Sequence, residues 1–477
     1  MKYYCLLLAV VASISPVTLR AATLYWDNAG TGVNWGTASA NWSTDLAGTT
    51  QQAFVANDNV IFSSTPATNA SAVTISNFTE TTFGTVTKSS GAALTLSAAA
   101  TGQLFTVGGG NIDVSTTGAA NSLSLSANVS LSSGSSSQNI TKTGAGFLYV
   151  LGPWKDGSTV LPRFIANNSG TSGSVGVAPG ALSNGTTATT VIEVNGGSFT
   201  FRSAGTHYYL GLAGGNATQG RVLPEGGSKT VQLGETSADT YTYAGTLENN
   251  GANVLSITKT GTNTQNFSYT GSTGAIFYTG TTTVSGGRLN FNGGSEFTLT
   301  TGAVNVNSGG TLGGSGVKGG AVTVATGGFL NPGSESLNAA AAPGTLTLSN
   351  TLTTSGTITM DIASLASFDR VVGITTFTLG GGLSINLSGS YVNGNTWDLF
   401  DFTERTGNFS TLALTGSYVG SLARTGDIWS GTVGGLGWEF NQANGVLSAV
   451  PEPSTWALMG LGGGLLLAHL RRRARRP

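Results

Sequence analysis

The chain has 477 residues, of which 73 are glycine and only 9% are Asp, Glu, Lys or Arg. So little charge cannot cover the surfaces of long helices, and the regular apolar content excludes a disordered chain, so we expect a folded, β-rich protein. The formal net charge is −1, but both ends are basic, and the body between residues 23 and 449 carries −7. A weakly acidic body argues against nucleic acid as a partner, because phosphate binding needs clustered Lys and Arg.

The first 22 residues have the features of a secretory signal peptide. Lys2 is followed by an apolar stretch at residues 3–11, and two alanines precede the expected cleavage point. We therefore assign residues 1–22 as the signal and expect the general secretion machinery as a partner. Cys5 is the single cysteine and lies inside this segment. The mature chain then has no thiol, which excludes disulfides, Cys-ligated metal sites and cysteine nucleophiles.

Residues 23–92 open with a stretch that is dense in tryptophan. Trp26, Trp35 and Trp42 lie close together, although the whole chain has only eight tryptophans. They could stack on sugar rings, but a repetitive β structure must also cover the open end of its core. We favour the second interpretation, an N-terminal cap followed by the first β coils.

Short segments of alternating apolar residues follow, separated by Gly, Ser and Asn. Strands of this length, with turn residues at short and fairly even spacing, are typical of an all-β solenoid, sandwich or barrel. The expected strands are 59–62, 72–75, 93–96, 104–107, 112–114 and 123–125.

Internal repeats favour the solenoid among these three architectures. Ile-Thr-Lys-Thr-Gly occurs at residues 140–144 and again, identically, at 257–261. Gly-Ala-Val-x-Val occurs at residues 302–306 and again 18 residues later at 320–324. A unit of about twenty residues with glycine at its corners is what one coil of a β-helix requires.

These repeated motifs resemble autotransporter-associated β-strand repeats. Lys-Thr-Gly before alternating apolar residues, and Gly-Gly-x-Leu turns near Val-x-Val strands, carry the resemblance, which we assign to residues 93–343. The resemblance implies a right-handed parallel β-helix. Glycine at tight corners and rows of Thr, Ser and Asn between coils agree with such a fold.

From residue 344 the expected strands become longer, at 344–348, 356–362 and 375–379. Two aromatic-rich segments follow, at 397–402 and 437–440. We assign residues 344–449 as a C-terminal β cap.

Residues 450–477 form a tail with three parts. Pro451, Glu452 and Pro453 break any helix or central strand, because proline fixes φ and lacks a backbone donor. An apolar segment then begins at Trp456 and ends at Leu470, and positive charge after it resists translocation. The basic stop consists of Arg471, Arg472, Arg473, Arg475 and Arg476.

This order closely resembles the PEP-CTERM sorting signal. The resemblance implies a short transmembrane helix, export and processing of the tail by the membrane protease exosortase. The apolar segment is shorter than the ~20 residues of a spanning helix and contains several glycines, which suits a transient anchor. The alternatives are an ordinary C-terminal anchor helix and a Pro-rich surface tail with a chance apolar segment.

The sequence contains no convincing catalytic, cofactor or metal site. The densest acidic group, Asp398, Asp401 and Glu404, fits the polar face of a strand better than a pair of glycosidase carboxylates. His207 has no second histidine in the body and is interpreted as a surface or capping residue. Residues 108–113 contain one Gly-rich turn that is no convincing Ca²⁺ repeat.

We therefore expect a non-enzymatic structural or adhesive protein of the cell surface or extracellular matrix. It would be anchored transiently by its tail and released into an outer envelope or biofilm matrix, with polysaccharide as a further partner. The alternative is a polysaccharide-active or sugar-binding β-helix, lyase-like or hydrolase-like, displayed at the surface.

Overall fold

The computed structural model describes most of the chain between Ala21 and Pro451. The described segments are 21–26, 41–63, 74–75, 81–90, 93–98, 103–115, 122–132, 139–154, 163–168, 173–182, 188–202, 205–216, 219–269, 276–293, 302–333 and 343–451, with five single residues between 461 and 471.

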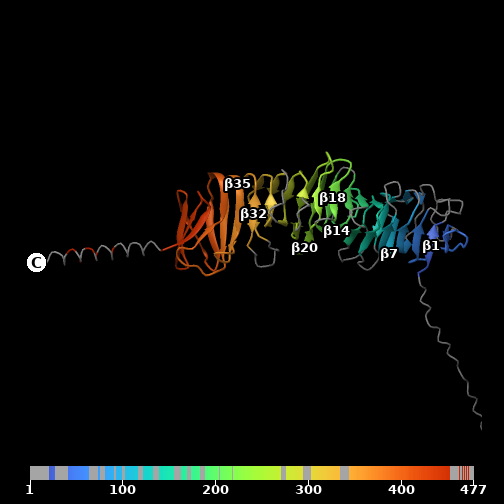
Figure 1. The fold of residues 1–477 in the computed structure, drawn as a ribbon, viewed down its shortest axis with the longest axis horizontal. Coiled ribbons are helices and arrows are strands. Elements are labelled where there is room, and N and C mark those ends of the chain that lie inside the picture. Colours follow the sequence, from blue (N-terminus) through green and yellow to red (C-terminus); the bar gives the residue numbers. More distant parts are fainter. Residues whose placement is uncertain are drawn as a thin grey trace, which may run out of the picture.

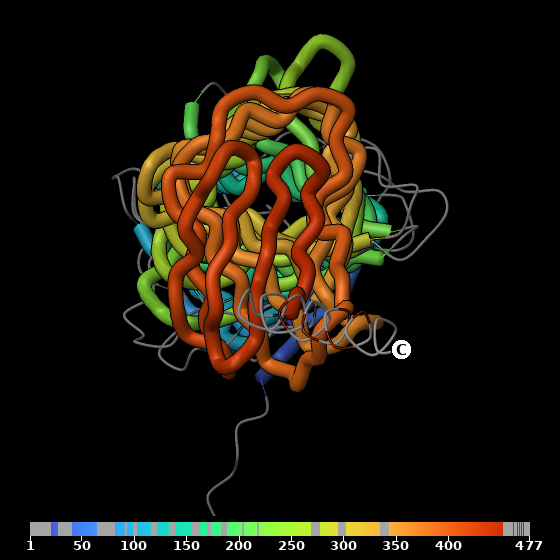
Figure 2. The backbone as a smooth tube through the Cα atoms, turned by 90° about the vertical axis from the view of Figure 1, so that its left-hand side faces the viewer, coloured from blue at the N-terminus to red at the C-terminus, as the bar shows by residue number. Residues whose placement is uncertain are grey.

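The described segments form one elongated stack of β coils, with blue coils at one end and orange-red strands at the other (Figure 1). Nearly all strand pairs are parallel, and each strand pairs with the strand that follows about one coil later along the chain. The structure confirms the all-β solenoid predicted from the repeats. Viewed along the stack, the coils superimpose around a common core (Figure 2).

The strands are grouped into four long sheets and one closing sheet. The first sheet contains β1 (Thr23–Trp26), β2 (Trp42–Ser43), β3 (Asn59–Phe62), β5 (Thr81–Lys88), β7 (Gln103–Val114), β9 (Val129–Ser132), β10 (Ile140–Thr143), β12 (Arg163–Asn167), β14 (Val191–Gly196) and β17 (Gly211–Ala213). The second contains β4 (Thr74–Ile75), β6 (Leu94–Leu96), β8 (Leu123–Leu125), β11 (Phe147–Val150), β13 (Ser174–Val177), β15 (Ser198–Phe201), β18 (Arg221–Pro224), β21 (Thr246–Glu248) and β24 (Ile276–Phe277).

The other two long sheets belong mainly to the second half of the stack. The third sheet contains β16 (Thr206–Tyr209), β19 (Lys229–Leu233), β22 (Leu255–Lys259), β25 (Thr282–Val284), β27 (Val304–Val306), β29 (Val317–Lys318), β30 (Val322–Val324), β32 (Thr345–Leu348), β33 (Leu352–Thr354), β35 (Arg370–Leu379) and β38 (Phe400–Gly407). The fourth contains β20 (Thr240–Tyr243), β23 (Thr264–Tyr269), β26 (Gly287–Gly293), β28 (Gly310–Gly314), β31 (Phe329–Pro332), β34 (Thr357–Ile362), β36 (Gly382–Leu387), β39 (Thr411–Gly416) and β40 (Gly420–Ser421).

The closing sheet is antiparallel and five-stranded. It consists of β37 (Thr396–Asp398), β41 (Ala423–Thr425), β42 (Ile428–Val433), β43 (Leu436–Asn441) and β44 (Val446–Val450), in the order β37-β44-β43-β42-β41. The parallel pairing of β34, β36 and β39 runs past residue 344 without a break. The boundary at residue 344 therefore stays a prediction, while the change from parallel to antiparallel pairing comes at the closing sheet.

Equivalent side chains of successive coils stack into apolar rows. In the second sheet, inward residues lie directly above one another because the parallel register is kept from coil to coil. Burying each such side chain stabilises the fold by about 1.5–3 kcal/mol. The longest row contains Leu94, Leu123, Leu148, Val175, Phe199, Val222 and Leu247, all at most 4% exposed.

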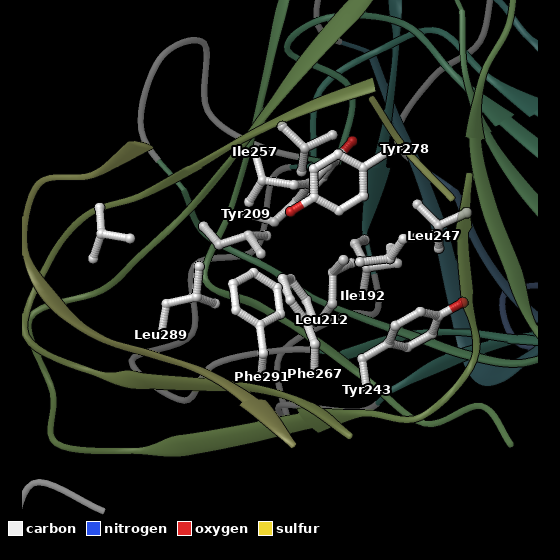
Figure 3. Close-up of a cluster of buried hydrophobic side chains, with 14 of the residues drawn as sticks. Ile192, Tyr209, Leu212, Tyr243, Leu247, Ile257, Phe267, Tyr278, Leu289 and Phe291 are labelled. Atoms are coloured by element: carbon white, nitrogen blue, oxygen red, sulfur yellow. The ribbon is translucent and has the colours of Figure 1, made fainter. Parts of the chain in front are cut away.

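Near the middle of the stack the first sheet ends at β17, and the fourth sheet begins with β20 and continues the same side of the coil. The Gly214 N–H donates to the Thr242 carbonyl at 3.1 Å, which joins β17 to β20. Beside this contact the side-chain amide of Gln265 makes the two hydrogen bonds that a neighbouring strand would otherwise make to Leu212. It accepts from the Leu212 N–H and donates to the Leu212 carbonyl, both at 2.9 Å. Tyr209, Tyr243 and Tyr278 help to fill the core at this level (Figure 3).

Aromatic clusters close both ends of the core. Trp26 and Trp42 lie on β1 and β2, are at most 1% exposed, and meet edge to face with ring centroids 5.1 Å apart. These two rings cannot offer a face to a sugar, which supports the capping interpretation; Trp35 lies outside the described residues. At the other end Trp397 and Trp438 stack beneath the closing sheet at 6.1 Å.

We expect Trp42→Ala to destabilise the N-terminal coils by about 3–5 kcal/mol, because it leaves a large cavity where the core ends. Hydrogen exchange should show lost protection in β1, β2 and β3, with β36 and β39 unchanged, since each coil of a solenoid contacts only its neighbours. Val419→Ala, at a side chain that is 78% exposed, is the control and should change neither region. Uniform loss of protection along the stack would contradict this local role.

Candidate functional site

The predicted sorting motif begins where the fold ends. Pro451 directly follows β44, which lies between β37 and β43 in the closing sheet. Gly437 pairs with Val450, and a Cβ on Gly437 would lie 2.5 Å from the Val450 carbonyl oxygen. The tail is therefore attached to an interior strand with no intervening linker.

Most of the predicted tail residues lie outside the described residues. This holds for Glu452, Pro453, Trp456, Leu470, Arg472, Arg473, Arg475 and Arg476. Leu461, Leu465, Leu467 and Arg471 are described, have helical geometry and are exposed. Among the described residues, no helix combines the length and apolar character needed to cross a membrane. The transmembrane helix stays a prediction.

The sequence analysis missed a set of lysines that point into the solenoid. They occupy places in the apolar core rows: Lys142 lies between Ile112 and Ala166, and Lys259 between Leu233 and Val284. The five buried lysines are Lys88, Lys142, Lys229, Lys259 and Lys318, all at most 2% exposed. A buried ammonium is costly unless its donors are satisfied, so each lysine must find acceptors inside the corner of its coil.

Lys142 shows how the repeated Lys-Thr-Gly motif works. Its Nζ donates to the carbonyls of Gly144 at 2.8 Å and Gly146 at 2.7 Å, and to the amide oxygen of Asn168. Gly144 has φ +81°, and a Cβ there would lie 2.4 Å from the Val114 carbonyl oxygen of the coil before. Glycine thus lets the corner turn tightly, and the lysine binds the carbonyls that the turn directs inward. The sequence signal was the repeated lysine just before an invariant turn glycine in the two copies.

Burial lowers the pKa of these lysines. The pKa of Lys142 falls to about 8 and that of Lys318 to about 8, and desolvation of the ammonium is the largest cause. For Lys142 the charge of Asp113 acts in the opposite direction and partly restores the pKa. We therefore expect these two lysines to make the stability of the stack depend on pH.

A continuous polar row runs along the outside of the third sheet. Parallel register places one outward residue of each strand above the next, and all of them are at least partly exposed. Thr406 Oγ1 lies 3.1 Å from Thr378 Oγ1 in this row. The outer row consists of Tyr208, Gln232, Thr258, Thr283, Asn305, Thr323, Thr353, Thr378 and Thr406.

The structure places the remaining candidates as follows. His207 is fully buried in β16, with its ring 4.8 Å from that of Phe201, so the surface interpretation was wrong. Burial lowers its pKa to about 3, and nearby Lys229 adds to the effect.

Asp398 and Glu404 are exposed on strands whose neighbouring aromatic side chains turn inward, as the sequence predicted, and Asp398 pairs with Arg370. Among the described residues, no group of His, Cys, Asp and Glu could hold a metal ion.

Two comparisons with known proteins bear on this arrangement. The family model described as the PEP-CTERM protein-sorting motif matches residues 449–476. A stretch of 62 residues is 53% identical to the protein called adhesin BmaC autotransporter from Brucella suis biovar 1 (strain 1330). That stretch is 13% of this chain and 2% of the adhesin, so the chain spans only a small part of that relative.

The fold and these similarities define the class as an exported, cell-surface β-solenoid protein. Within that class, the chain carries a match to the PEP-CTERM sorting motif at residues 449–476 and shares a stretch of sequence with an autotransporter adhesin, which agrees with both resemblances seen in the sequence.

We expect the free energy of unfolding to depend on pH through Lys142. The folded-state pKa of about 8 lies below the ordinary value of 10.5, so the unfolded chain holds more protons between these two values. Stability should therefore rise as pH increases from about 8 towards 10.5 and should be independent of this group at lower pH, with a slope of up to roughly tenfold in the unfolding equilibrium constant per pH unit.

Urea unfolding of the wild-type protein and of Lys142→Met at several pH values measures this contribution. The variant should show a smaller increase in stability above pH ~8, because Met does not titrate. The other buried lysines are present in both proteins and cancel in the comparison. Equal slopes for the two proteins would show that Lys142 keeps an ordinary pKa.

Proposed function

We propose that this protein is a non-enzymatic structural and adhesive component of the cell surface or extracellular matrix, and that exosortase removes its tail after export. The observation that carries the proposal is the attachment of the sorting motif to an interior strand at the end of the stack. A tail in this position would hold the end of the solenoid at the membrane and would direct the remaining coils away from it.

The solenoid suits a role as a rigid spacer. Its parallel strands form hydrogen bonds from coil to coil, and both ends of the core are covered by aromatic side chains. Ion pairs add to the outer surface: Arg163 Nη1 lies 2.9 Å from Glu193 Oε2 of the next coil, and Arg405 Nη2 on β38 lies 2.8 Å from Asp427 Oδ1 in the turn between β41 and β42. Such exposed pairs contribute little stability individually, at about 0–1 kcal/mol.

The outer row supports the adhesive part of the proposal. It presents hydroxyl and amide groups at the regular spacing of successive strands, ~4.8 Å, along one face. A polysaccharide has many hydroxyl groups that can form hydrogen bonds with such a row. The protein that shares a stretch of sequence with this chain is named an adhesin, which agrees with an adhesive role.

Processing of the tail can be tested by expression in two hosts, one with exosortase and one without it. We expect the mature protein to lose the tail close to Pro451 only in the host that has the enzyme, as measured by intact mass and sequencing of the C-terminal peptide. A tail that is intact in both hosts would contradict the proposal and leave a plain anchor as the interpretation.

In the host with exosortase, Glu452→Gln should reduce removal of the tail at least tenfold if the protease reads the carboxylate, since losing one charge-assisted contact costs about 1.5–3 kcal/mol. Glu404→Gln makes the same chemical change at an exposed site on β38 and should be processed normally. Equal processing of both variants would show that the motif is not read through Glu452.

Adhesion can be tested by co-sedimentation with envelope polysaccharide. Replacing Thr323, Thr353 and Thr378 by Ala should weaken binding severalfold, because the row would lose three neighbouring hydroxyls. The control replaces Thr411, Thr425 and Thr432, which are exposed but do not form this row. If both triple variants bind as the wild type does, the outer row is not the adhesive surface.

A further inference from the structure

The backbone at the start of the first coil contacts a buried carboxylate. Ala22, the residue before β1, donates its N–H to Asp58 Oδ1 at 2.8 Å, and its carbonyl accepts from the Asn59 N–H at 2.8 Å. Ala22 packs against the hydrophobic core, whereas Ala21 is exposed. Ala22 is therefore the first residue that the fold holds on both sides of its peptide unit.

A tight turn fixes Asp58 in this position. Its backbone N–H donates to the Val55 carbonyl at 3.1 Å, and its Oδ2 accepts from the Val55 N–H at 2.9 Å. Its own carbonyl accepts from the Gly84 N–H of the following coil at 2.9 Å. Asn57 within the turn has φ +73°, a left-handed conformation that asparagine adopts more readily than most residues. The carboxylate is thus held against the Ala22 nitrogen by its own coil and by the next one.

The hydrogen bonds to this carboxylate come from neutral groups. Asp58 is 5% exposed, and its two oxygens accept from the backbone N–H groups of Ala22 and Val55. Among the residues that the structure describes, no lysine or arginine side chain forms an ion pair with Asp58. A buried carboxylate is costly unless an opposite charge is paired with it. A positive charge on the Ala22 nitrogen would provide that partner.

We propose that the mature chain begins at Ala22 and that its α-ammonium group forms an ion pair with Asp58. Hydrolysis of the Ala21–Ala22 peptide bond consumes one water: the hydroxyl group goes to the Ala21 carbonyl carbon, and the hydrogen goes to the Ala22 nitrogen. The new amine takes up one proton from solvent, since α-amino groups are mostly protonated at neutral pH. Its nitrogen is the atom that already lies 2.8 Å from Oδ1. The proposal rests on the predicted signal peptide and places the cut one residue earlier.

A cut after Ala22 fits the structure less well. It would remove the residue that binds both Asp58 Oδ1 and the Asn59 N–H, so the first coil would lose two hydrogen bonds to the next coil. Leaving a buried donor or acceptor without its partner destabilises a fold more than the hydrogen bond itself contributes. The contacts of Ala22 therefore favour a cut in front of it.

The sequence around the cut agrees. Signal cleavage sites resemble Ala-x-Ala, with small residues at the first and third places before the cut. For a cut after Ala22 the third place is taken by Arg20, which is large and charged. For a cut after Ala21 it is taken by Leu19, which is uncharged, and Ala21 is the small residue at the first place. The earlier cut is the better match to the pattern.

Removal of the signal would then strengthen the first coil. In the precursor Asp58 accepts from a neutral amide, and in the mature chain it accepts from a charged donor, which makes a hydrogen bond roughly twice as strong. We expect the free amine to reduce the opening of β1 and β3 about tenfold. The N-terminal cover of Trp26 and Trp42 therefore gains its full stability after export.

The first test is the N-terminal sequence of the purified exported protein, supported by its intact mass. We expect the chain to begin Ala-Thr-Leu-Tyr, with Ala22 as its first residue. A chain that begins at Thr23 or at another residue would overturn the proposal and leave the predicted signal peptide in place. An uncut chain would overturn both.

The second test separates the ion pair from the hydrogen bond. Insertion of one threonine between Ala21 and Ala22 moves the amine one residue away from Asp58 and keeps the Ala22 N–H as an amide. Asp58→Asn removes the charge and keeps an acceptor oxygen. Four exported proteins, with neither change, either change or both, form a double-mutant cycle, and N-terminal sequencing verifies where each one begins.

Hydrogen exchange in β1 and β3 measures the opening of the first coil in these four proteins, with β36 and β39 as the control region. Asp58→Asn should increase this opening about tenfold more in the protein that begins at Ala22 than in the protein with the insertion. The loss of an acceptor for Val55 is common to both proteins and cancels. Equal increases in the two proteins would overturn the ion pair.

Discussion

The hydrogen bond between a backbone group and its counterpart one coil later is the interaction on which the rest of this structure depends. It fixes the register, and the register decides which side chains form the rows inside and outside the stack. A slip of one residue would turn an apolar row such as Leu148 and Val175 towards solvent. The last coil at each end leaves backbone donors and acceptors unpaired and one side of the core open, so both ends of the stack need a cover. The N-terminal end uses the short antiparallel pair β1 and β2, and the C-terminal end uses a complete antiparallel sheet.

The buried lysines illustrate how a coil can turn a corner without exposing its core. Each turn directs carbonyl groups inward, where water cannot reach them, and an unpaired buried carbonyl costs about 1–3 kcal/mol. The ammonium group of Lys142 supplies donors for several of these carbonyls at once. Its own burial is expensive, which is why its pKa falls. Cation and carbonyls therefore stabilise each other, and neither would be tolerated there alone.

The sequence allowed the architecture to be predicted because its repeats are local. The segments at 59–62 and 123–125 correspond to β3 and β8, and the copies at 302–306 and 320–324 contain the paired strands β27 and β30. The predicted segments at 104–107 and 112–114 are parts of one strand, β7, whose pairing with β5 shifts register at Phe83 and Thr85. Alternation and turn residues identify strands in this way, but they do not show which strand pairs with which across many residues.

The features that the sequence did not reveal all depend on such distant contacts. The Gln265 side chain is hydrogen-bonded to the backbone of Leu212, which is 53 residues away, as a neighbouring strand would be. No local sequence pattern distinguishes Gln265 from any other glutamine. His207 follows a threonine and precedes two tyrosines, a polar-looking context, yet the strand turns its ring into the core beside Phe201. The sequence shows that the lysine of the motif is repeated, but it does not show that the side chain points into the core. That direction follows from the pairing of Lys142 with Ile112 and Ala166 on the neighbouring strands.

The two covers do not depend on the number of coils between them. The length of the stack can therefore change while both covers stay the same. Duplicating one unit of the type seen at β27 and β30 would lengthen the stack by one strand spacing, ~4.8 Å, and leave the tryptophan cover and the closing sheet as they are. Unequal recombination between the repeated segments at 140–144 and 257–261 would remove or add several coils in one event. The length of the stack can thus change in evolution by whole steps, without any change in the residues that cover its two ends.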